Sequence, residues 1–188
     1  EVDSTNSELM RRARAGRTEP VLLVTERQTA GRGRMGRQWH SGAGPEVAHM
    51  GAISPSLTFS LGLPLAPQDW SGLSLAVGVS VAQSLHPDLR LKWPNDLWLH
   101  DRKLAGILIE TVSLGESPGV RYAVVGIGIN IREREATGLS TPPAWLGEVL
   151  PGMDAPQALL RIAAPLVRAL KAFEQHGFSP FRSEEHTS

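Results

Sequence analysis

The chain alternates between hydrophobic patterns with helical spacing and patterns typical of strands. Three segments have helical spacing, at residues 5–15, 71–85 and 156–176. In the first of them, the pair Thr5 and Glu8 predicts a capping box that opens the helix.

The second and third helices carry their own end signals. Ser71 is a favourable N-cap residue directly before the second apolar pattern. Pro165 lies inside the third pattern, where its missing amide hydrogen predicts a kink, and Gly177 is a favourable stop for that helix.

Apolar runs predict five strands. They cover residues 21–25, 56–63, 89–93, 104–112 and 120–131. The last three follow one another with turn signals between them, which predicts an antiparallel meander. Together with the helices, these strands predict an α+β fold with a mixed, largely antiparallel sheet and helices packed on one face.

Length, composition and charge favour one soluble domain. The chain has 188 residues, of which 41% are hydrophobic, enough for one sizeable core. Its 19 basic and 19 acidic residues cancel, so the overall charge does not favour a nucleic acid or a membrane as the main partner. The absence of cysteine excludes disulfides and is compatible with a reducing cytoplasm, where we expect the protein.

The positive charge is unevenly distributed. Eight of the 16 arginines lie between Arg11 and Arg37. Within this stretch, the run Gly31-Arg32-Gly33-Arg34-Met35-Gly36-Arg37, followed by Trp39, combines arginine with glycine. Arginine supplies paired donors and glycine allows backbone amides to approach a ligand, so the run favours a mobile loop that closes over phosphates.

Two other interpretations of this run are weaker. Gly31, Gly33 and Gly36 fit the dinucleotide pattern G-x-G-x-x-G, but the run neither leaves a strand directly nor opens a helix. An arginine- and glycine-rich segment that binds nucleic acid is the second alternative, and a single copy without flanking repeats makes it weak.

Three further motifs follow, and each has an ordinary structural explanation beside a functional one. Asn95 and Asp96 in Lys92-Trp93-Pro94-Asn95-Asp96 either form a plain turn or project into a cleft. Lys103 in Lys103-Leu104-Ala105-Gly106 is either a surface residue or a compact charge for a phosphate or carboxylate. The glycines of Gly126-Ile127-Gly128-Ile129-Asn130 admit either a flat ligand or a tightly packed helix.

In this order and spacing, the four motifs resemble the catalytic domain of biotin protein ligases, which activate biotin with ATP and attach it to a carrier lysine. The resemblance covers residues 2 to about 181. It implies a mixed sheet with flanking helices, biotin and ATP as substrates, Mg²⁺ with ligands left unassigned, and the biotin carboxyl carrier protein of acetyl-CoA carboxylase as partner. It implies no nucleic-acid or membrane partner for this fragment and leaves the oligomeric state open, a homodimer included.

The resemblance also implies roles for individual residues. Biotin would contact Ser4, Thr5, Gln28, Gly31, Arg32, Gly106, Leu108 and Gly126. ATP would contact Arg32, Arg34, Trp39, Asn95, Lys103 and Asn130. The catalytic residues would be Lys103 and Arg34, which offset phosphate charge, and Asp96, which orients or deprotonates the carrier lysine.

The chain also departs from the family pattern. Residues 45–55 are interpreted as an insertion, residues 1–181 as a catalytic domain without the family's C-terminal barrel, and residues 182–188 as a non-native tail. Two alternative functions stay open. One is a lipoate or octanoate ligase or transferase of the same superfamily, disfavoured because those proteins lack this combination of motifs. The other is a biotin-responsive transcriptional regulator, if a DNA-binding domain preceded Glu1.

Overall fold

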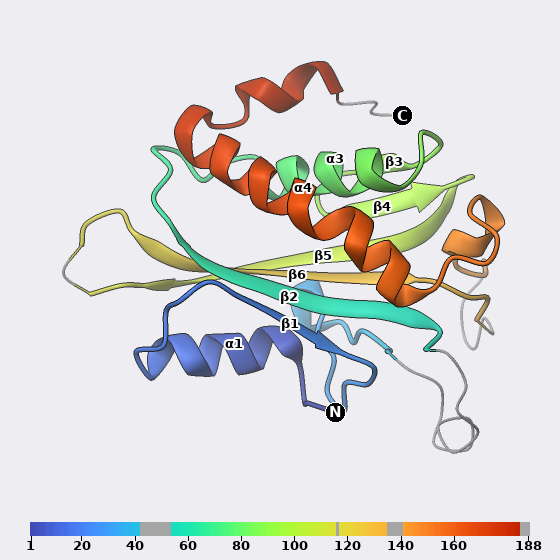
Figure 1. Ribbon diagram of the computed structural model, residues 1–188, viewed down its shortest axis with the longest axis horizontal. Helices are drawn as coiled ribbons and strands as arrows, with labels where there is room; N and C mark the ends of the chain where they lie inside the picture. Colours follow the sequence, from blue (N-terminus) through green and yellow to red (C-terminus); the bar gives the residue numbers. More distant parts are fainter. Residues whose placement is uncertain (42–53, 116, 135–140, 185–188) are drawn as a thin grey trace.

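A six-stranded sheet forms the centre of the fold (Figure 1). The computed structural model describes residues 1–41, 54–115, 117–134 and 141–184, so most of the predicted insertion and residues 185–188 of the predicted tail lie outside the described residues. The strands are β1 (Val21–Thr25), β2 (Ser56–Leu65), β3 (Arg90–Lys92), β4 (Asp96–Leu99), β5 (Arg102–Ser113) and β6 (Arg121–Asn130). Their order is β1-β2-β6-β5-β4-β3, and all neighbouring pairs are antiparallel.

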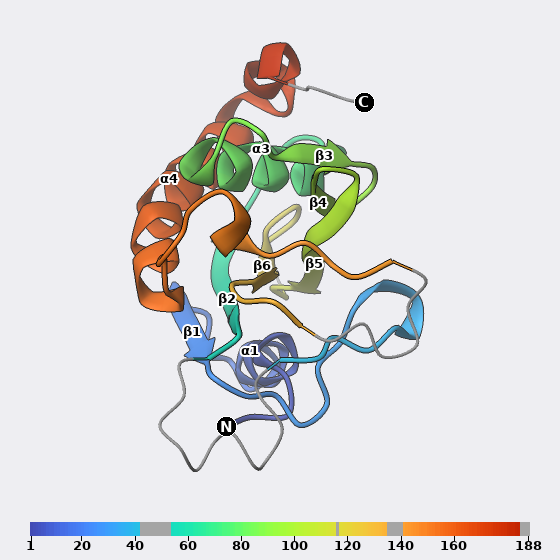
Figure 2. The same cartoon turned by 90° about the vertical axis from the view of Figure 1, so that its right-hand side faces the viewer.

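Helices cover both faces of this sheet. Helix α1 (Thr5–Arg14) lies on one face, and α3 (Leu73–Leu85) and α4 (Ala155–His176) lie on the other (Figures 1 and 2). The α+β class is thus confirmed, and the sheet, predicted to be mixed and largely antiparallel, is antiparallel between all neighbouring strands. The expectation that the helices lie on one face is corrected by the position of α1.

Side chains along β6 point alternately to the two faces of the sheet and so contribute to two separate core clusters. Tyr122 and Val124 pack against the apolar side of α1, where Leu9 is fully buried. Ala123 and Val125 belong to the larger cluster shared with α3 and α4. This two-sided burial follows from the period of two in a strand, because successive side chains point to opposite faces of the sheet.

Helix α4 supplies a stripe of apolar side chains to the larger cluster. Its members are spaced by three or four residues and are almost fully buried: Ala158, Ile162, Leu166, Leu170 and Phe173. Asp154 and Gln157 form a reciprocal capping box at its start, with hydrogen bonds of 2.8 and 3.1 Å. The helix continues through Pro165, so the proline does not end it, and the kink expected there stays a prediction.

The predicted elements are present with shifted ends. The N-cap of α1 is Ser4, whose Oγ accepts a hydrogen bond from Ser7 N at 3.3 Å, so the predicted Thr5/Glu8 capping box is wrong. Gly72 rather than Ser71 precedes α3, and no side chain caps that helix. Strand β4 was not predicted; it begins at Asp96, in the run for which a plain turn was one of the predictions.

No helix among the described residues combines the length and the apolar character needed to cross a membrane.

Replacing Phe173 by alanine should destabilise the fold strongly. The side chain is 0% exposed in the larger cluster, so its removal leaves a cavity and should lower the free energy of unfolding by about 3–5 kcal/mol. Leu160→Ala is the matched control on the same helix, because Leu160 is 81% exposed, and it should change stability by less than about 0.5 kcal/mol. Urea unfolding followed by circular dichroism measures both, and equal effects would contradict the assignment of this helix face.

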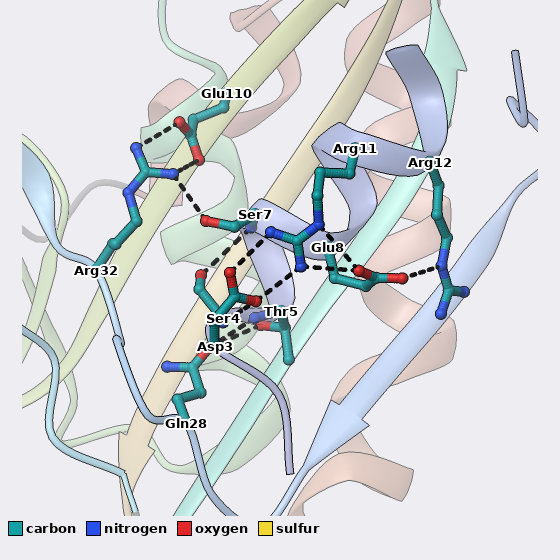
Figure 3. A network of polar contacts seen from close by, with 10 residues as sticks. All are labelled: Asp3, Ser4, Thr5, Ser7, Glu8, Arg11, Arg12, Gln28, Arg32 and Glu110. Atoms are coloured by element: carbon teal, nitrogen blue, oxygen red, sulfur yellow. Dashed lines mark hydrogen bonds and ion pairs between the residues drawn. The ribbon is translucent and has the colours of Figure 1, made fainter. Parts of the chain in front are cut away.

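The Asp3 carboxyl should titrate well below its usual range. Arg11 donates to both its oxygens at 2.7 and 2.8 Å, and Ser4 N donates to Oδ1, which together hold its pKa at about 2, down from 3.8 (Figure 3). Because the folded-state pKa is the lower one, the carboxylate stabilises the fold above about pH 3.8, and this contribution is lost as pH falls toward 2.

An NMR titration of the Asp3 carboxyl tests this assignment. The pKa should rise toward 3.8 in Arg11→Ala and stay near 2 in the control Arg14→Ala, which replaces an exposed arginine of the same helix. A pKa near 3.8 in the unmodified protein would show that the ion pair does not form in solution.

Candidate functional site

A cavity of about 470 Å³ lies on the face of the sheet that α1 only partly covers. The first residues of α1 line one end of it, and the middle of β5 and the second half of β6 form its floor. Residues 31–39, named here the cationic loop, cover it, and the turn between β3 and β4 forms the remaining wall.

Two glycines of β6 shape the floor. A Cβ atom on Gly126 would lie 2.2 Å from Asn6 Oδ1, and one on Gly128 would lie 2.3 Å from the Trp39 ring. Neither distance is compatible with a side chain, so both positions require glycine. A residue of helix α1 lies over Gly126, as the tight-packing explanation expects, whereas a loop residue lies over Gly128; both glycines also line the cavity, so contact of their backbone with a ligand stays a prediction.

Buried polar side chains form the end of the cavity next to α1. Asn6 donates from Nδ2 to Leu108 O at 3.1 Å and to Glu110 Oε2 at 3.0 Å, and its Oδ1 accepts from Ser60 Oγ at 2.6 Å. Asn6 is only 3% exposed and Ser60 is fully buried. Hydrogen bonds on both ends of the amide fix its orientation, because an unpaired buried polar group is costly.

Thr5 and Gln28 extend this polar region into the cavity. Gln28 Oε1 accepts from Thr5 N at 2.8 Å and lies 3.3 Å from Thr5 Oγ1 (Figure 3). Thr5 Oγ1 is also 2.7 Å from Ser60 Oγ. The result is a set of uncharged donors and acceptors with defined orientation.

The cationic loop folds back on itself. Trp39 N donates to Gly31 O at 2.9 Å, and Gly33 N donates to Arg37 O at 2.7 Å, on either side of a 3₁₀ turn at Arg34–Gly36. This hairpin places Arg34 and Arg37 at the cavity. Within the described part of the chain, neither of these guanidinium groups forms an ion pair, so both are available to an anion.

The wall opposite the loop also carries positive charge. Lys103 Nζ lies 2.9 Å from Asp96 Oδ1, across the β4–β5 hairpin. Asn95 Nδ2 donates to Ile107 O at 2.8 Å, which fixes the turn before β4. Lys92 Nζ lies 3.4 Å above the centre of the Trp98 ring, at the edge of the cavity. An anion between this wall and the loop would meet cations on both sides.

The structure brings most of the expected site residues together. Among the residues that the structure describes, the following expected site residues line the cavity: Ser4, Thr5, Gln28, Arg32, Arg34, Trp39, Asn95, Asp96, Lys103, Gly106, Leu108 and Gly126. Gly31 lines a neighbouring hollow under the same loop.

Asn130 is placed elsewhere. It is 5% exposed, it donates from Nδ2 to Ala144 O at 3.1 Å, and it is not among the described residues that line the cavity. It lies at the end of β6, and its partner is backbone from a segment that no motif marks. The expected contact with ATP is therefore not supported by its position.

Three polar residues at or near the cavity were not predicted from the sequence. Asn6, Ser60 and Glu110 belong to no recognisable motif, and their partners are distant in the chain, with a sequence separation of 104 between Asn6 and Glu110. The available signal was weak: Ser60 and Glu110 are polar residues within largely apolar strands, and Asn6 is one of several polar residues in α1.

The cavity therefore has two chemically different ends. One end offers uncharged hydrogen-bonding groups from α1 and Gln28, and the other lies between the arginines of the loop and Lys103. This arrangement suits a ligand with a polar, uncharged head and an anionic group at its other end.

Comparisons with known proteins agree with this chemistry. Residues 2–130 match the Biotin/lipoate A/B protein ligase family. The chain is 35% identical over 190 residues to the bifunctional ligase/repressor BirA of Escherichia coli (strain K12), covering 97% of this chain and 55% of that protein. It is 34% identical over 196 residues to the biotin–[acetyl-CoA-carboxylase] ligase of Paracoccus denitrificans, covering 96% of this chain and 75% of that protein.

A solved structure extends the similarity to the fold. The biotin protein ligase from Aquifex aeolicus in complex with biotin and ATP superimposes with a TM-score of 0.71 and 30% identity, over 97% of this chain and 73% of that one. The chain spans about half the length of the E. coli relative, with 55% covered. The match over most of its residues is nevertheless clear, and the chain belongs to the Biotin/lipoate A/B protein ligase family.

Proposed function

We propose that this chain is the catalytic part of a biotin-protein ligase. It would activate biotin with ATP to biotinyl-5′-AMP and transfer the biotinyl group to a lysine of a biotin carboxyl carrier protein. The observation that carries the proposal is the two-ended cavity, with uncharged groups around Thr5 and Gln28 and cations at Arg34 and Lys103. The similarity to a ligase solved with biotin and ATP supports it.

The uncharged end favours biotin over lipoate. The ureido ring of biotin has two N–H donors and one carbonyl acceptor, which suit the uncharged polar side chains of Thr5 and Gln28 that line this end of the cavity. The dithiolane ring of lipoate offers no comparable groups and would gain no hydrogen bonds at this polar end, so it should bind less well. We therefore disfavour a lipoate or octanoate ligase.

The charged end suits the first chemical step. A carboxylate oxygen of biotin attacks the α-phosphorus of ATP, the bond to the bridging oxygen of the β-phosphate breaks, and pyrophosphate leaves. Arg34 from the loop and Lys103 from β5 would stabilise the negative charge on the oxygens of the α-phosphate during the attack. Lys103 Nζ lies 2.9 Å from Asp96 Oδ1, so Lys103 would have to leave Asp96 in order to contact the ligand.

Asp96 would then serve the second step. When Lys103 turns to the anionic ligand, the Asp96 carboxylate becomes free to orient the carrier lysine or to accept its proton. The lysine amine attacks the carbonyl carbon of the mixed anhydride and AMP leaves. Trp39, which lies over Gly128, would flank the adenine, and the cationic loop would limit access of water to the anhydride.

The described residues also fit a magnesium ion brought in with the nucleotide. Mg²⁺ at such sites commonly uses one or two carboxylates together with substrate phosphates. Asp96 is a suitable carboxylate during the first step, before it would serve the carrier lysine, and the described residues contain no group of three acidic or histidine side chains that would form a separate protein cage. Bound there, the ion would neutralise phosphate charge. We also propose a cytoplasmic location, where ATP and the carrier protein are available.

The first experiment is biotin-dependent release of pyrophosphate from Mg-ATP by the purified chain. Biotin should support release, whereas lipoate and octanoate at the same concentration should not, because they lack the ureido ring. Release with lipoate but not with biotin would refute the assignment of substrate. Absence of release with any of the three acids from a folded protein would refute ligase activity of this chain.

Lys103→Ala and Arg34→Ala should each lower the rate of pyrophosphate release by about 100-fold or more, since each removes a cation from the developing charge. The matched controls Lys171→Ala and Arg168→Ala replace exposed residues of α4 on the other face of the sheet and should retain the original rate. An unaltered rate in either site variant would remove that residue from the proposed mechanism.

A further inference from the structure

Arg32 of the cationic loop is joined to β5 by an ion pair. Its Nη2 lies 2.9 Å from Glu110 Oε1 and its Nη1 lies 3.3 Å from Oε2, so the guanidinium engages both oxygens (Figure 3). The same Nη1 lies 3.2 Å from Ser7 Oγ on α1. Paired contacts of this kind restrict orientation more than a single hydrogen bond does.

The Glu110 carboxylate is itself held in place. It lies on the central strand β5, opposite Val124 of β6, and its side chain is 21% exposed. Oε2 also accepts the hydrogen bond from Asn6 Nδ2 at 3.0 Å, and Asn6 is fixed by Leu108 and Ser60. Glu110 is therefore a rigid acceptor that contacts both the polar end of the cavity and the loop above it.

Holding Arg32 orients the rest of the loop. Arg32 pairs with Gln38 across the hairpin, and Trp39 N is bonded to Gly31 O, so the positions of Arg32 and Trp39 are coupled. Between them lies the 3₁₀ turn that carries Arg34. Among the described residues, the Arg32–Glu110 contact is the only ion pair that joins this loop to the sheet.

We propose that Glu110 is a positioning residue, which holds the cationic loop over the cavity through Arg32 and thereby places Arg34 and Trp39. Its consequence for catalysis rests on the ligase function proposed above: a loosened loop would lose the mixed anhydride before transfer. The pairing also changes the expectation for Arg32. Its charge is matched by Glu110, so its side chain serves the loop, and Arg34 is left as the phosphate partner.

Hydrogen exchange of the ligand-free protein tests the positioning role without reference to activity. Glu110→Gln removes the charge but keeps an oxygen that can accept from Asn6, and Arg32→Gln removes the partner while leaving the Glu110–Asn6 contact intact. In each variant, amides of residues 31–39 should exchange about fivefold faster, while peptides of β6 should be unchanged. The double variant should show no further increase, because both changes remove one interaction.

Glu8→Gln is the matched control. Glu8 also pairs with arginine and has a similar exposed fraction, 25%, but its partners Arg11 and Arg12 lie on α1 outside the loop. It should leave exchange of residues 31–39 unchanged. High salt should accelerate loop exchange in the unmodified protein more than in the variants, because the Arg32 side chain is 48% exposed and the pair is open to screening.

The activity measurement is the ratio of pyrophosphate released to biotin transferred to carrier. This ratio should be close to one in the unmodified protein and in Glu8→Gln, and should rise about threefold or more in Glu110→Gln and Arg32→Gln as the anhydride escapes. Unchanged loop exchange in Arg32→Gln would overturn the positioning role. If the exchange results hold but no protein releases pyrophosphate, the proposed function fails and the loop contact stands.

Discussion

The site depends on a difference in length between α1 and the strand beneath it. Ten helical residues span about 15 Å, whereas ten residues of β6 span about 33 Å, so α1 covers only part of that face. Its apolar residues pack on Tyr122 and Val124, in the first half of β6. Beyond them the strand carries Gly126 and Gly128, which Asn6 and Trp39 approach closely, and the space left beside these contacts is the cavity. A loop, rather than a helix, then closes it.

The same geometry explains why the two ends of the cavity differ. The first turn of α1 lies at the boundary between packed core and open space, so its residues are polar and meet polar partners from β2 and β5. The loop and the β4–β5 hairpin enter from the sides and carry the cations. Two of those cations are held by carboxylates in the ligand-free state: Arg32 by Glu110 and Lys103 by Asp96. In our account the first pair persists and the second opens for the substrate.

Much of this could be predicted from the sequence where information is local. The spacing of apolar residues predicted the three helices and five of the six strands. The motifs pointed to Arg34, Asp96 and Lys103, which line one cavity. Periodicity does not state which face of a sheet a helix covers, so the position of α1 was missed. Glu110 and Asn6 were missed for a related reason: their importance comes from contacts between distant segments, which neither residue type nor spacing reveals. Asn130 belongs to a motif but lies outside the described lining of the cavity, because its amide bonds the backbone of Ala144.

The central claim is that the uncharged end of the cavity receives the ureido ring and the cationic end receives the carboxylate and the nucleotide. A crystal structure of the chain with biotin and a non-hydrolysable ATP analogue tests it most directly. We predict the ureido group within hydrogen-bonding distance of Thr5 and Gln28, and the biotin carboxylate between Arg34 and Lys103. Biotin bound in the opposite orientation, or outside this cavity, would contradict the account.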